Sequence, residues 1–352
     1  MAKQMKEYIV EQAVCWQRIL QEKLIMTEET SGKLQARKPK HLIVFGSGSS
    51  YIAGCVAKVF AEKYCGLHTM VLTPSQLYSQ MQFYAPEQSL VVAVSQSGKS
   101  VTTMEALHWL KLHGYTVIGM TADAESQIAN AADGHVLIDC GEEVVGPKTK
   151  GMTGTVLALY MLAMELNLDE AERTEIFAQL TKAVTYGMLN QKVAENFFET
   201  HKTFFTEAGA MLIIAEEQAY ASCLEGALKL LETIYIPVEA LELEEYTHGV
   251  QNTIEPGLHH ILVATNAENA GRMAQLNRFQ LEKGCKNICL ATVKNYNEAD
   301  TLQLESTHRD YTLFMELLPV FHVFSAYGSE AKGIDCDHPK FANFYSIMGT
   351  KM

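Results

Sequence analysis

The chain has 352 residues and a formal net charge of −13 at pH 7, with a pI near 5.4. This acidity argues against a nucleic-acid-binding face, which needs clustered cations. No apolar run reaches the roughly 18–20 residues of a membrane span, and Glu7 and Glu11 interrupt any signal-peptide core. We therefore expect a cytoplasmic globular protein that contacts neither membrane nor nucleic acid.

The eight cysteines are scattered along the chain, with no Cys-x-x-Cys pair and no regular spacing. Neither a disulfide framework nor a zinc cluster is indicated, and reduced buried cysteines are the simpler interpretation. We expect no metal ion and no other cofactor.

Strand and helix patterns alternate through the first half of the chain. Residues 5–35 are predicted to be helical, and short apolar runs that lead into helical stretches follow them. These runs are HLIVF at 41–45, TMVLTP at 69–74, SLVVAV at 89–94, TVIGMTA at 116–122 and GHVLIDCG at 134–141. Such alternation predicts a parallel sheet with helices on both faces. Residues 153–187 are predicted to be mostly helical and to connect to a second half.

The second half of the sequence repeats the first. Residues 259–292 match residues 89–122, and residues 210–231 have the layout of residues 41–60. The equivalent pairs lie 169 or 170 residues apart and include Tyr51 and Tyr220, Ser95 and Thr265, and Gly114 and Gly284. A near-constant offset at three points indicates a duplication, with the division near residue 195.

Two loops rich in hydroxyl groups, GSGSS at 46–50 and SQSGKS at 95–100, follow predicted strands of the first copy. In an open parallel sheet, ligands bind at the carboxyl ends of the strands, where helices begin with free N–H groups. The hydroxyl donors there are Ser50, Ser95, Ser97 and Ser100. This chemistry suits a phosphate. The alternative is that the serines only cap helices.

The equivalent loops of the second copy differ in charge. They read AEEQA and TNAENA, and they carry Glu216, Glu217 and Glu268 in place of most of the hydroxyl groups. Carboxylates repel an anion, so we expect only the first copy to bind one.

The segment LEGALKLLETIY at 224–235 places Glu225, Lys229 and Glu232 on one face of a predicted helix. A carboxylate buried among the apolar neighbours could act as a general base, whereas a solvated Glu–Lys ladder is the alternative. His248 follows Glu232 by sixteen residues and is a candidate general acid, although a histidine before glycine is often structural or exposed.

The ordered set GSGSSY, SQSGKS, LEGALKLLE, THG and the tail GIDCDHP resembles the sugar isomerase (SIS) family. The tandem arrangement is similar to the isomerase half of glucosamine-6-phosphate synthase and, more closely in architecture, to fructosamine-6-phosphate deglycases. The resemblance covers about residues 35–345.

This resemblance implies an α/β fold of two tandem SIS domains, each a flavodoxin-like three-layer sandwich of a parallel sheet flanked by helices. The predicted organisation is an N-terminal helix at 1–34, a first SIS domain with the phosphosugar-binding loops at 35–195, and a second with the catalytic helix and tail at 196–352.

The resemblance also implies roles for individual residues. It assigns phosphosugar binding to Ser50, Ser95, Gln96, Ser97 and Ser100, and it places Thr149 and Lys150 on a loop that closes near the sugar. It implies that Glu232 moves a proton between C1 and C2. It implies that His248 serves ring opening or proton transfer in the partner subunit's site, so a homodimer or a higher homo-oligomer is expected.

Two departures from the synthases bear on the reaction. The sequence begins MAKQ and leaves no room for a glutaminase domain, so synthesis of glucosamine 6-phosphate from glutamine is not expected. The synthases carry a ketose-reactive lysine five residues after the tail proline, and here Phe344 follows Pro339 at that distance.

The sequence therefore favours a deglycase that converts a 6-phosphorylated Amadori sugar, a fructosamine or ketosamine 6-phosphate of an amino acid, to hexose 6-phosphate and free amine. Open alternatives are a sugar-phosphate aldose–ketose isomerase, an amino-sugar isomerase or deaminase, and a non-catalytic sugar-phosphate sensor. No linear motif identifies the amino acid.

Overall fold

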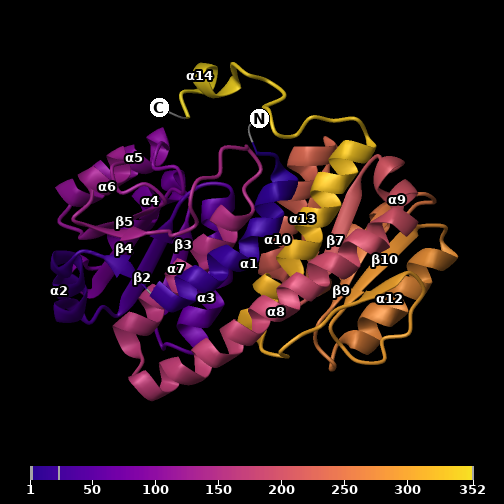
Figure 1. The fold of residues 1–352 in the computed structure, drawn as a ribbon, viewed down its shortest axis with the longest axis horizontal. Helices are drawn as coiled ribbons and strands as arrows, with labels where there is room; N and C mark the ends of the chain where they lie inside the picture. The colour runs from indigo at the N-terminus through magenta and orange to yellow at the C-terminus, as the bar shows by residue number, and fades with distance from the viewer. Residues whose placement is uncertain (1–2, 23, 351–352) are drawn as a thin grey trace. The chain divides into compact units, whose positions relative to one another are not determined.

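The computed structural model describes residues 3–22 and 24–350 (Figure 1). The chain folds into two compact units. The first unit comprises Val14–Val144, Lys148–Ala178 and Pro339–Met352, and the second comprises Met1–Ala13, Val145–Pro147 and Gln179–His338. Each unit contains one β-sheet.

The sheet of the first unit is almost entirely parallel. Its strands are β1 (Ile25–Met26), β2 (His41–Phe45), β3 (His68–Leu72), β4 (Ser89–Val94), β5 (Val117–Thr121) and β6 (Gly134–Leu137). They lie in the order β1-β6-β5-β4-β2-β3, and only the pairing of β1 with β6 is antiparallel. Every residue of β4 and β5 is buried, because both faces of the sheet are covered, which explains their uninterrupted apolar sequences.

Helices cover both faces of this sheet. They are α3 (Ser49–Lys63), α4 (Pro74–Gln80), α5 (Val101–Leu112), α6 (Gln127–Ala131) and α7 (Lys150–Asn167). α3 packs against α7 and, through Gly54, against Val44 of β2. Ile43 and Phe45 share a core with α4, α5 and α6. Because side chains alternate along a strand, these two sets of helices lie on opposite faces.

The second unit repeats this strand order. Its strands are β7 (Met211–Ala215), β8 (Val238–Glu242), β9 (His259–Ala264), β10 (Lys286–Ala291) and β11 (Thr301–Gln303). They lie in the order β11-β10-β9-β7-β8, with all pairs parallel. The order β3-β2-β4-β5-β6 of the first unit is the same pattern, so the predicted duplication and the flavodoxin-like α/β class are confirmed.

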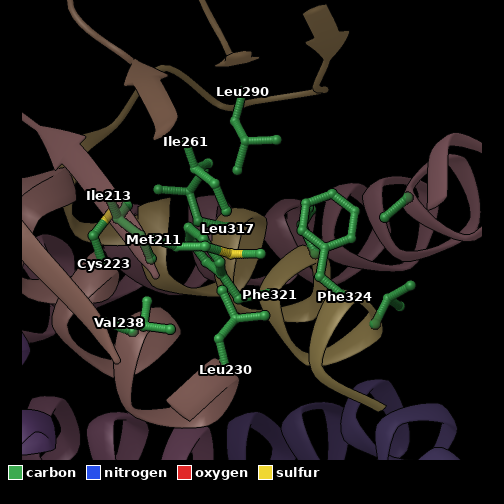
Figure 2. Close-up of a cluster of buried hydrophobic side chains, with 14 of the residues drawn as sticks. Met211, Ile213, Cys223, Leu230, Val238, Ile261, Leu290, Leu317, Phe321 and Phe324 are labelled. Atoms are coloured by element: carbon green, nitrogen blue, oxygen red, sulfur yellow. The ribbon is translucent and has the colours of Figure 1, made fainter. Parts of the chain in front are cut away.

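Helices also enclose the second sheet. The long helices are α8 (Glu170–Thr200), α10 (Glu217–Ile234), α12 (Ala270–Glu282) and α13 (Leu313–Ala331), and the short ones are α9 (Lys202–Thr206) and α11 (Leu243–Thr247). Figure 2 shows the core on one face, where Ile213 and Ile261 meet Leu230 of α10 and Phe321 of α13. Ile214 and its neighbours on the other face pack with α11 and α12.

The remaining elements are short, except for the helix at the N-terminus. They are α1 (Met5–Glu22), α2 (Glu28–Arg37), α14 (Phe344–Met348) and the 3₁₀ helices Met81–Phe83, Pro86–Gln88, Val250–Thr253 and Asp310–Thr312. The single helix expected over residues 5–35 is wrong, because β1 interrupts it. Ile25 and Met26 extend the first sheet by pairing with β6, and the Thr27 hydroxyl then caps α2 by accepting from the Thr30 N–H.

The contact between α10 and α13 depends on a glycine. A Cβ atom added at Gly226 would lie 2.6 Å from the ring of Phe321, which is fully buried. The two helices can therefore pack at this separation only while residue 226 has no side chain. This contact also sets the position of the neighbouring Glu225 and Lys229 on α10.

We predict that Gly226→Ala destabilises the protein by about 1–3 kcal/mol, because overpacking forces Phe321 or the helix backbone to move. Gly271→Ala is the matched control, since Gly271 is exposed in α12 and nothing lies within 4 Å of its added methyl group. The control is expected to leave stability unchanged or to raise it by up to about 1 kcal/mol. Urea unfolding measures both, and equal stabilities of the two variants would contradict the packing argument.

Candidate active site

The two hydroxyl-rich loops of the first unit follow adjacent strands. β2 pairs in parallel with β4 from His41 opposite Ser89 to Phe45 opposite Ala93. The chain turns from β2 to β3 on one side, and β4 lies on the other side, so the strand order reverses at this point. The two loops therefore lie at the place where open α/β sheets bind ligands.

The loop after β2 lies against the end of β4. A Cβ atom added at Gly46 would be 2.8 Å from the carbonyl oxygen of Val94 and 2.9 Å from Cβ of Ser50. Ser50 lies in the first turn of α3 and is half-buried. Only glycine permits this close approach of the two loops.

The loop after β4 is a tight turn. The Gly98 N–H donates to the Ser95 carbonyl at 2.8 Å, and Gly98 has φ of +66°. A Cβ atom at Gly98 would lie 2.2 Å from Cβ of Ser126, so the turn requires glycine. Ser95 is buried at the base of the turn, whereas Ser97 is exposed at its tip.

Ser100 has a structural role. Its hydroxyl oxygen accepts from the Thr103 N–H at 3.4 Å and from the Thr103 hydroxyl at 2.9 Å, so it is the N-cap of α5. The alternative that the loop serines cap helices is therefore confirmed for Ser100. Its place in the same loop as Ser95 and Ser97 leaves the phosphate role as a prediction.

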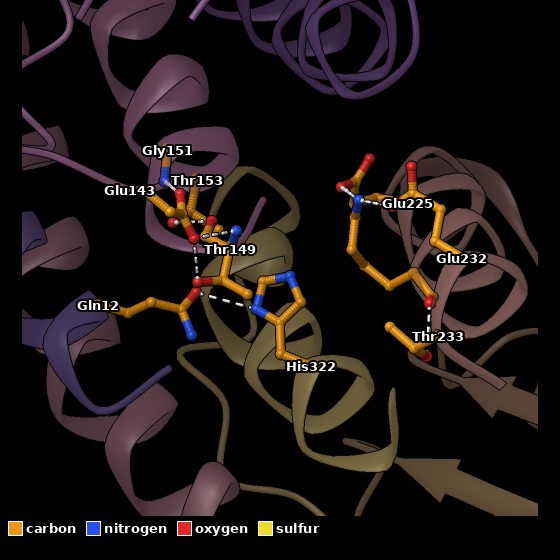
Figure 3. A network of polar contacts seen from close by, with 10 residues as sticks. Gln12, Glu143, Thr149, Gly151, Thr153, Glu225, Glu232, Thr233 and His322 are labelled. Carbon is orange, nitrogen blue, oxygen red and sulfur yellow. Dashed lines mark hydrogen bonds and ion pairs between the residues drawn. The ribbon is translucent and has the colours of Figure 1, made fainter. Parts of the chain in front are cut away.

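The predicted sugar-closing loop is organised by a carboxylate that the sequence reasoning missed (Figure 3). Glu143 is buried, and its Oε1 accepts from both the N–H and the hydroxyl of Thr149 at 2.7 Å. Its Oε2 accepts from the Gly151 N–H at 2.9 Å, so Glu143 caps the N-terminus of α7. The Thr149 hydroxyl is thus already used, and Lys150 is buried beside it. The segment GEEVVG before a predicted helix was the available signal.

Gln96 belongs to the same region of the first unit. A Cβ atom at Gly151 would lie 3.1 Å from Cγ and Nε2 of Gln96. Gln96 therefore connects the loop after β4 with the start of α7, where Thr149 and Lys150 lie. Five of the predicted binding residues belong to the two adjacent loop segments: Ser50, Ser95, Gln96, Ser97 and Ser100. The other two, Thr149 and Lys150, lie at the start of α7.

On α10 of the second unit, the buried Lys229 lies between two carboxylates, Glu225 and Glu232, which Figure 3 labels. Lys229 is 1% exposed, and its Nζ is 3.3 Å from Glu225 Oε1 and 2.5 Å from Glu232 Oε2. Glu225 is fully buried, whereas the Glu232 side chain is 35% exposed. The solvated-ladder alternative is therefore wrong for Glu225 and Lys229, and Glu232 alone reaches solvent.

The electrostatics of this cluster favour a charged lysine. Burial opposes the ammonium form of Lys229, but the nearby carboxylates of Glu225 and Glu232 outweigh it and raise the pKa of Lys229. The fixed ammonium orients the Glu232 carboxylate. The sequence placed Lys229 on the right face but did not single it out as part of a site.

His322 on α13 adds a buried neutral imidazole to the surroundings of this cluster. Its Nδ1 donates to Gln12 Oε1 at 3.1 Å, and its Nε2 is buried without a hydrogen-bond partner among residues 3–22 and 24–350. Burial, with a smaller effect from the Lys229 charge, lowers the pKa of His322 to about 3.

His248 is an exposed residue at the C-terminal end of α11. Its side chain is 74% exposed, and its Nδ1 lies 2.8 Å from the Glu244 carbonyl oxygen. No hydrogen bond or ion pair within the described part of the chain joins His248 to Glu232. Phe344 is exposed on α14.

Metal and membrane features are absent from the described parts of the chain. Residues 3–22 and 24–350 contain no cluster of three or more His, Cys, Asp or Glu side chains suited to a metal ion. None of the helices described there combines the length and hydropathy needed to cross a bilayer. The eight cysteines are free thiols, of which six are buried and two, Cys55 and Cys336, are partly exposed.

Comparison with known proteins agrees with this geometry. Residues 36–165, which contain β2 to β6 and both hydroxyl-rich loops, match the family described as the SIS domain. This part of the chain is similar to a SIS domain. The resemblance that the sequence motifs predicted is therefore confirmed.

Similarity extends beyond this SIS domain to nearly the whole chain. The glutamine–fructose-6-phosphate aminotransferase (isomerizing) of Staphylococcus aureus is 26% identical over 354 residues, covering 96% of this chain but only 57% of that relative. The C-terminal domain of glucosamine-fructose-6-phosphate aminotransferase from Francisella tularensis matches with a TM-score of 0.86 and 22% identity, over 96% of this chain and 99% of that one. Tagatose-6-phosphate ketose/aldose isomerase from Escherichia coli matches with a TM-score of 0.74 and 15% identity, over 96% and 95%. The predicted tandem SIS fold is confirmed.

The buried histidine gives a prediction for the pH dependence of stability. His322 stays neutral in the fold until about pH 3, whereas an unfolded histidine binds a proton near pH 6.5. Between these values the unfolded state holds one more proton, so the free energy of unfolding falls as pH falls from about 6.5 toward 3. We expect His322→Gln to reduce this slope and the exposed-site control His108→Gln to leave it unchanged. Urea unfolding from pH 7 to pH 5 measures both slopes, and identical slopes in wild type and His322→Gln would refute the assignment.

Proposed function

We propose that the protein is a phosphosugar enzyme of the SIS family that transfers a proton between C1 and C2 of a 6-phosphorylated sugar. The observation that carries the proposal is the pair of hydroxyl-rich loops after β2 and β4, at the reversal of strand order in a SIS domain. The names of the similar proteins, an isomerizing aminotransferase and a ketose/aldose isomerase, support this class of chemistry.

In this proposal the loops bind the phosphate through local donors. An acidic protein can hold an anion where backbone N–H groups and hydroxyls converge without a basic surface. Ser50, Ser95 and Ser97 would supply hydroxyls, and Ser100 would do so while it caps α5. Gln96, Thr149 and Lys150 would contact the sugar.

Glu232 is the proposed base. It is the one carboxylate of the α10 cluster that reaches solvent, and Lys229 holds its Oε2 in place. In the proposed reaction, Glu232 removes a proton from C1 of a ketosamine 6-phosphate to give an enaminol. Return of the proton to C2 gives an aldimine, and water then releases hexose 6-phosphate and the free amine. His248 would assist ring opening or proton transfer.

The substrate we favour is the 6-phosphorylated Amadori compound of an amino acid. Phe344 stands where the synthases have a ketose-reactive lysine, which favours cleavage or isomerisation over ketose amination. The similarity to a ketose/aldose isomerase also supports a second candidate, an aldose–ketose isomerase that uses the same proton transfer.

We further propose a homodimer in which His248 acts in the site of the partner subunit. Its exposed imidazole, without a link to Glu232 in the described chain, supports this assignment.

We predict that Glu232→Gln lowers turnover by at least roughly 100-fold, because an amide cannot accept the C1 proton. Its affinity for hexose 6-phosphate should stay near that of wild type, since the loops hold the phosphate. Ser97→Ala should show the reverse pattern, with weaker binding and a modest loss of rate. Release of hexose 6-phosphate from a panel of 6-phosphorylated amino-acid Amadori compounds measures turnover.

Glu239→Gln is the matched control, because Glu239 is an exposed carboxylate on β8, and its turnover should equal that of wild type. Normal turnover in Glu232→Gln would remove Glu232 as the base. If the wild type binds hexose 6-phosphate but turns over no Amadori compound or sugar phosphate, the proposal of an enzyme would be replaced by that of a non-catalytic sugar-phosphate sensor.

Subunit mixing tests the assembly. Glu232→Gln and His248→Ala should each be inactive alone, and their mixture should recover part of the wild-type activity after subunit exchange. Mixed dimers would contain one site with both residues intact. Mass spectrometry of isotope-labelled subunits verifies exchange, and exchange without recovered activity would assign both residues to one chain.

A further inference from the structure

A cavity of about 560 Å³ opens in the second unit, where the carboxyl ends of β7, β9 and β10 lie together. Residues that line it include Glu216, Thr265, Asn266, Lys294, His308 and Arg309. A neighbouring hollow of about 550 Å³ shares Thr292, Lys294, Ser306 and His308 with it. Each of the two volumes is within the size range of small-molecule sites.

This cavity lies at the second unit's own reversal of strand order. β7 pairs in parallel with both β8 and β9, as β2 does with β3 and β4. With the offset of 170 residues, Glu216 corresponds to Gly46 and Asn266 to Gln96. The first unit has no room for a side chain at Gly46, whereas the second places a carboxylate there.

Glu216 is only 2% exposed, and its hydrogen bonding is incomplete. Oε1 accepts from the Asn266 N–H at 3.2 Å, and Oε2 is buried without a hydrogen-bond partner among the described residues. Burial raises the pKa of Glu216 to about 7, and the nearby carboxylates of Glu217 and Glu242 add to this effect, against the opposing hydrogen bonds of Asn266 and Asn269. A bound ammonium group would satisfy Oε2 and stabilise the charged carboxylate.

Two other lining residues, Lys294 and Arg309, carry positive charge, and the acidic residues Glu217 and Asp310 also line the cavity. Lys294 follows β10, and His308 and Arg309 precede α13; all three are exposed. Glu217 and His308 have φ of +44° and +57°, so non-glycine residues hold the left-handed region on both sides of the cavity. The cavity thus offers a buried acceptor at one side and cationic side chains at another.

We propose that this cavity binds a small zwitterion, with its ammonium group against Glu216 and its acidic group toward Lys294 and Arg309. Two sources share this chemistry: a free amino acid, with a carboxylate, and an amino-sugar phosphate. The inference does not depend on the proposed function, because the residues of this cavity belong to the second unit and the phosphate loops to the first.

Binding to the full chain tests the proposal. Saturation-transfer NMR screens the twenty standard L-amino acids, D-glucosamine 6-phosphate and the amine-free control D-glucose 6-phosphate, and calorimetry then measures the affinity of each binder. We expect at least one amine-bearing probe to bind, with affinity reduced about 10-fold to 100-fold by Glu216→Gln. Lys294→Met should weaken the same probe, whereas Lys283→Met, an exposed lysine outside the cavity, should not.

The outcomes separate the two sources and the two sites. Glu216-dependent binding of an amino acid, or of glucosamine 6-phosphate, supports the proposal and identifies the source. If Ser97→Ala weakens the binding of a probe and Glu216→Gln leaves it unchanged, that probe binds to the first unit. Failure of every amine-bearing probe to show Glu216-dependent affinity, or an equal dependence for glucose 6-phosphate, overturns the proposal. Circular dichroism melts verify that Glu216→Gln is folded, and turnover of Amadori compounds in the same preparations reports on the proposed function separately.

Discussion

The parallel pairing of β2 with β4, repeated by β7 with β9, is the constraint from which the candidate sites follow. In each sheet the first of the five parallel strands lies between the second and the third, so the chain leaves it in one direction and returns on the other side. Two consecutive loops after those strands must then lie next to each other at the same edge. Helix N-termini follow them, which makes this edge suited to a ligand before any side chain is considered.

The two copies place opposite chemistry on this common scaffold. In the first unit, Gly46 and Gly98 allow the backbone to approach closely, and both loops carry serine residues. In the second unit, Glu216 occupies the position that corresponds to Gly46 and lines a cavity. Only one of its carboxylate oxygens, Oε1, has a hydrogen-bond partner among the described residues. The first arrangement favours an anion, whereas Glu216 in the second offers a carboxylate to a cationic group, although strand order and register are the same. Duplication of the fold has therefore not duplicated the binding chemistry.

The charged cluster of α10 is held by packing rather than by solvent. Burying Lys229 is unfavourable alone, because an ammonium group loses its hydration, and ion pairs with Glu225 and Glu232 offset this loss. The position of these residues depends on the contact of α10 with α13 at Gly226 and Phe321. One charged group of the cluster, Glu232, reaches solvent, and its carboxylate is anchored there by the buried ammonium of Lys229.

The amino-acid sequence by itself determined the α/β class, the duplication, the hydroxyl-rich loops and the shared helix face of Glu225, Lys229 and Glu232. These features follow from local periodicity and spacing, since an apolar run, a glycine-serine loop or an i, i+4, i+7 pattern is complete within a short segment. Tertiary structure alone decided which of these groups are buried and which residues they hydrogen-bond or pair with. It broke the expected helix over residues 5–35 with a strand that pairs with β6, and it made Ser100 a helix cap. It also placed Thr149 where its N–H and hydroxyl donate to Glu143, and it placed Glu216 in the lining of a cavity. Each of these outcomes depends on a residue distant in sequence or on how the surrounding elements pack. A local sequence pattern encodes neither the distant residue nor the packing.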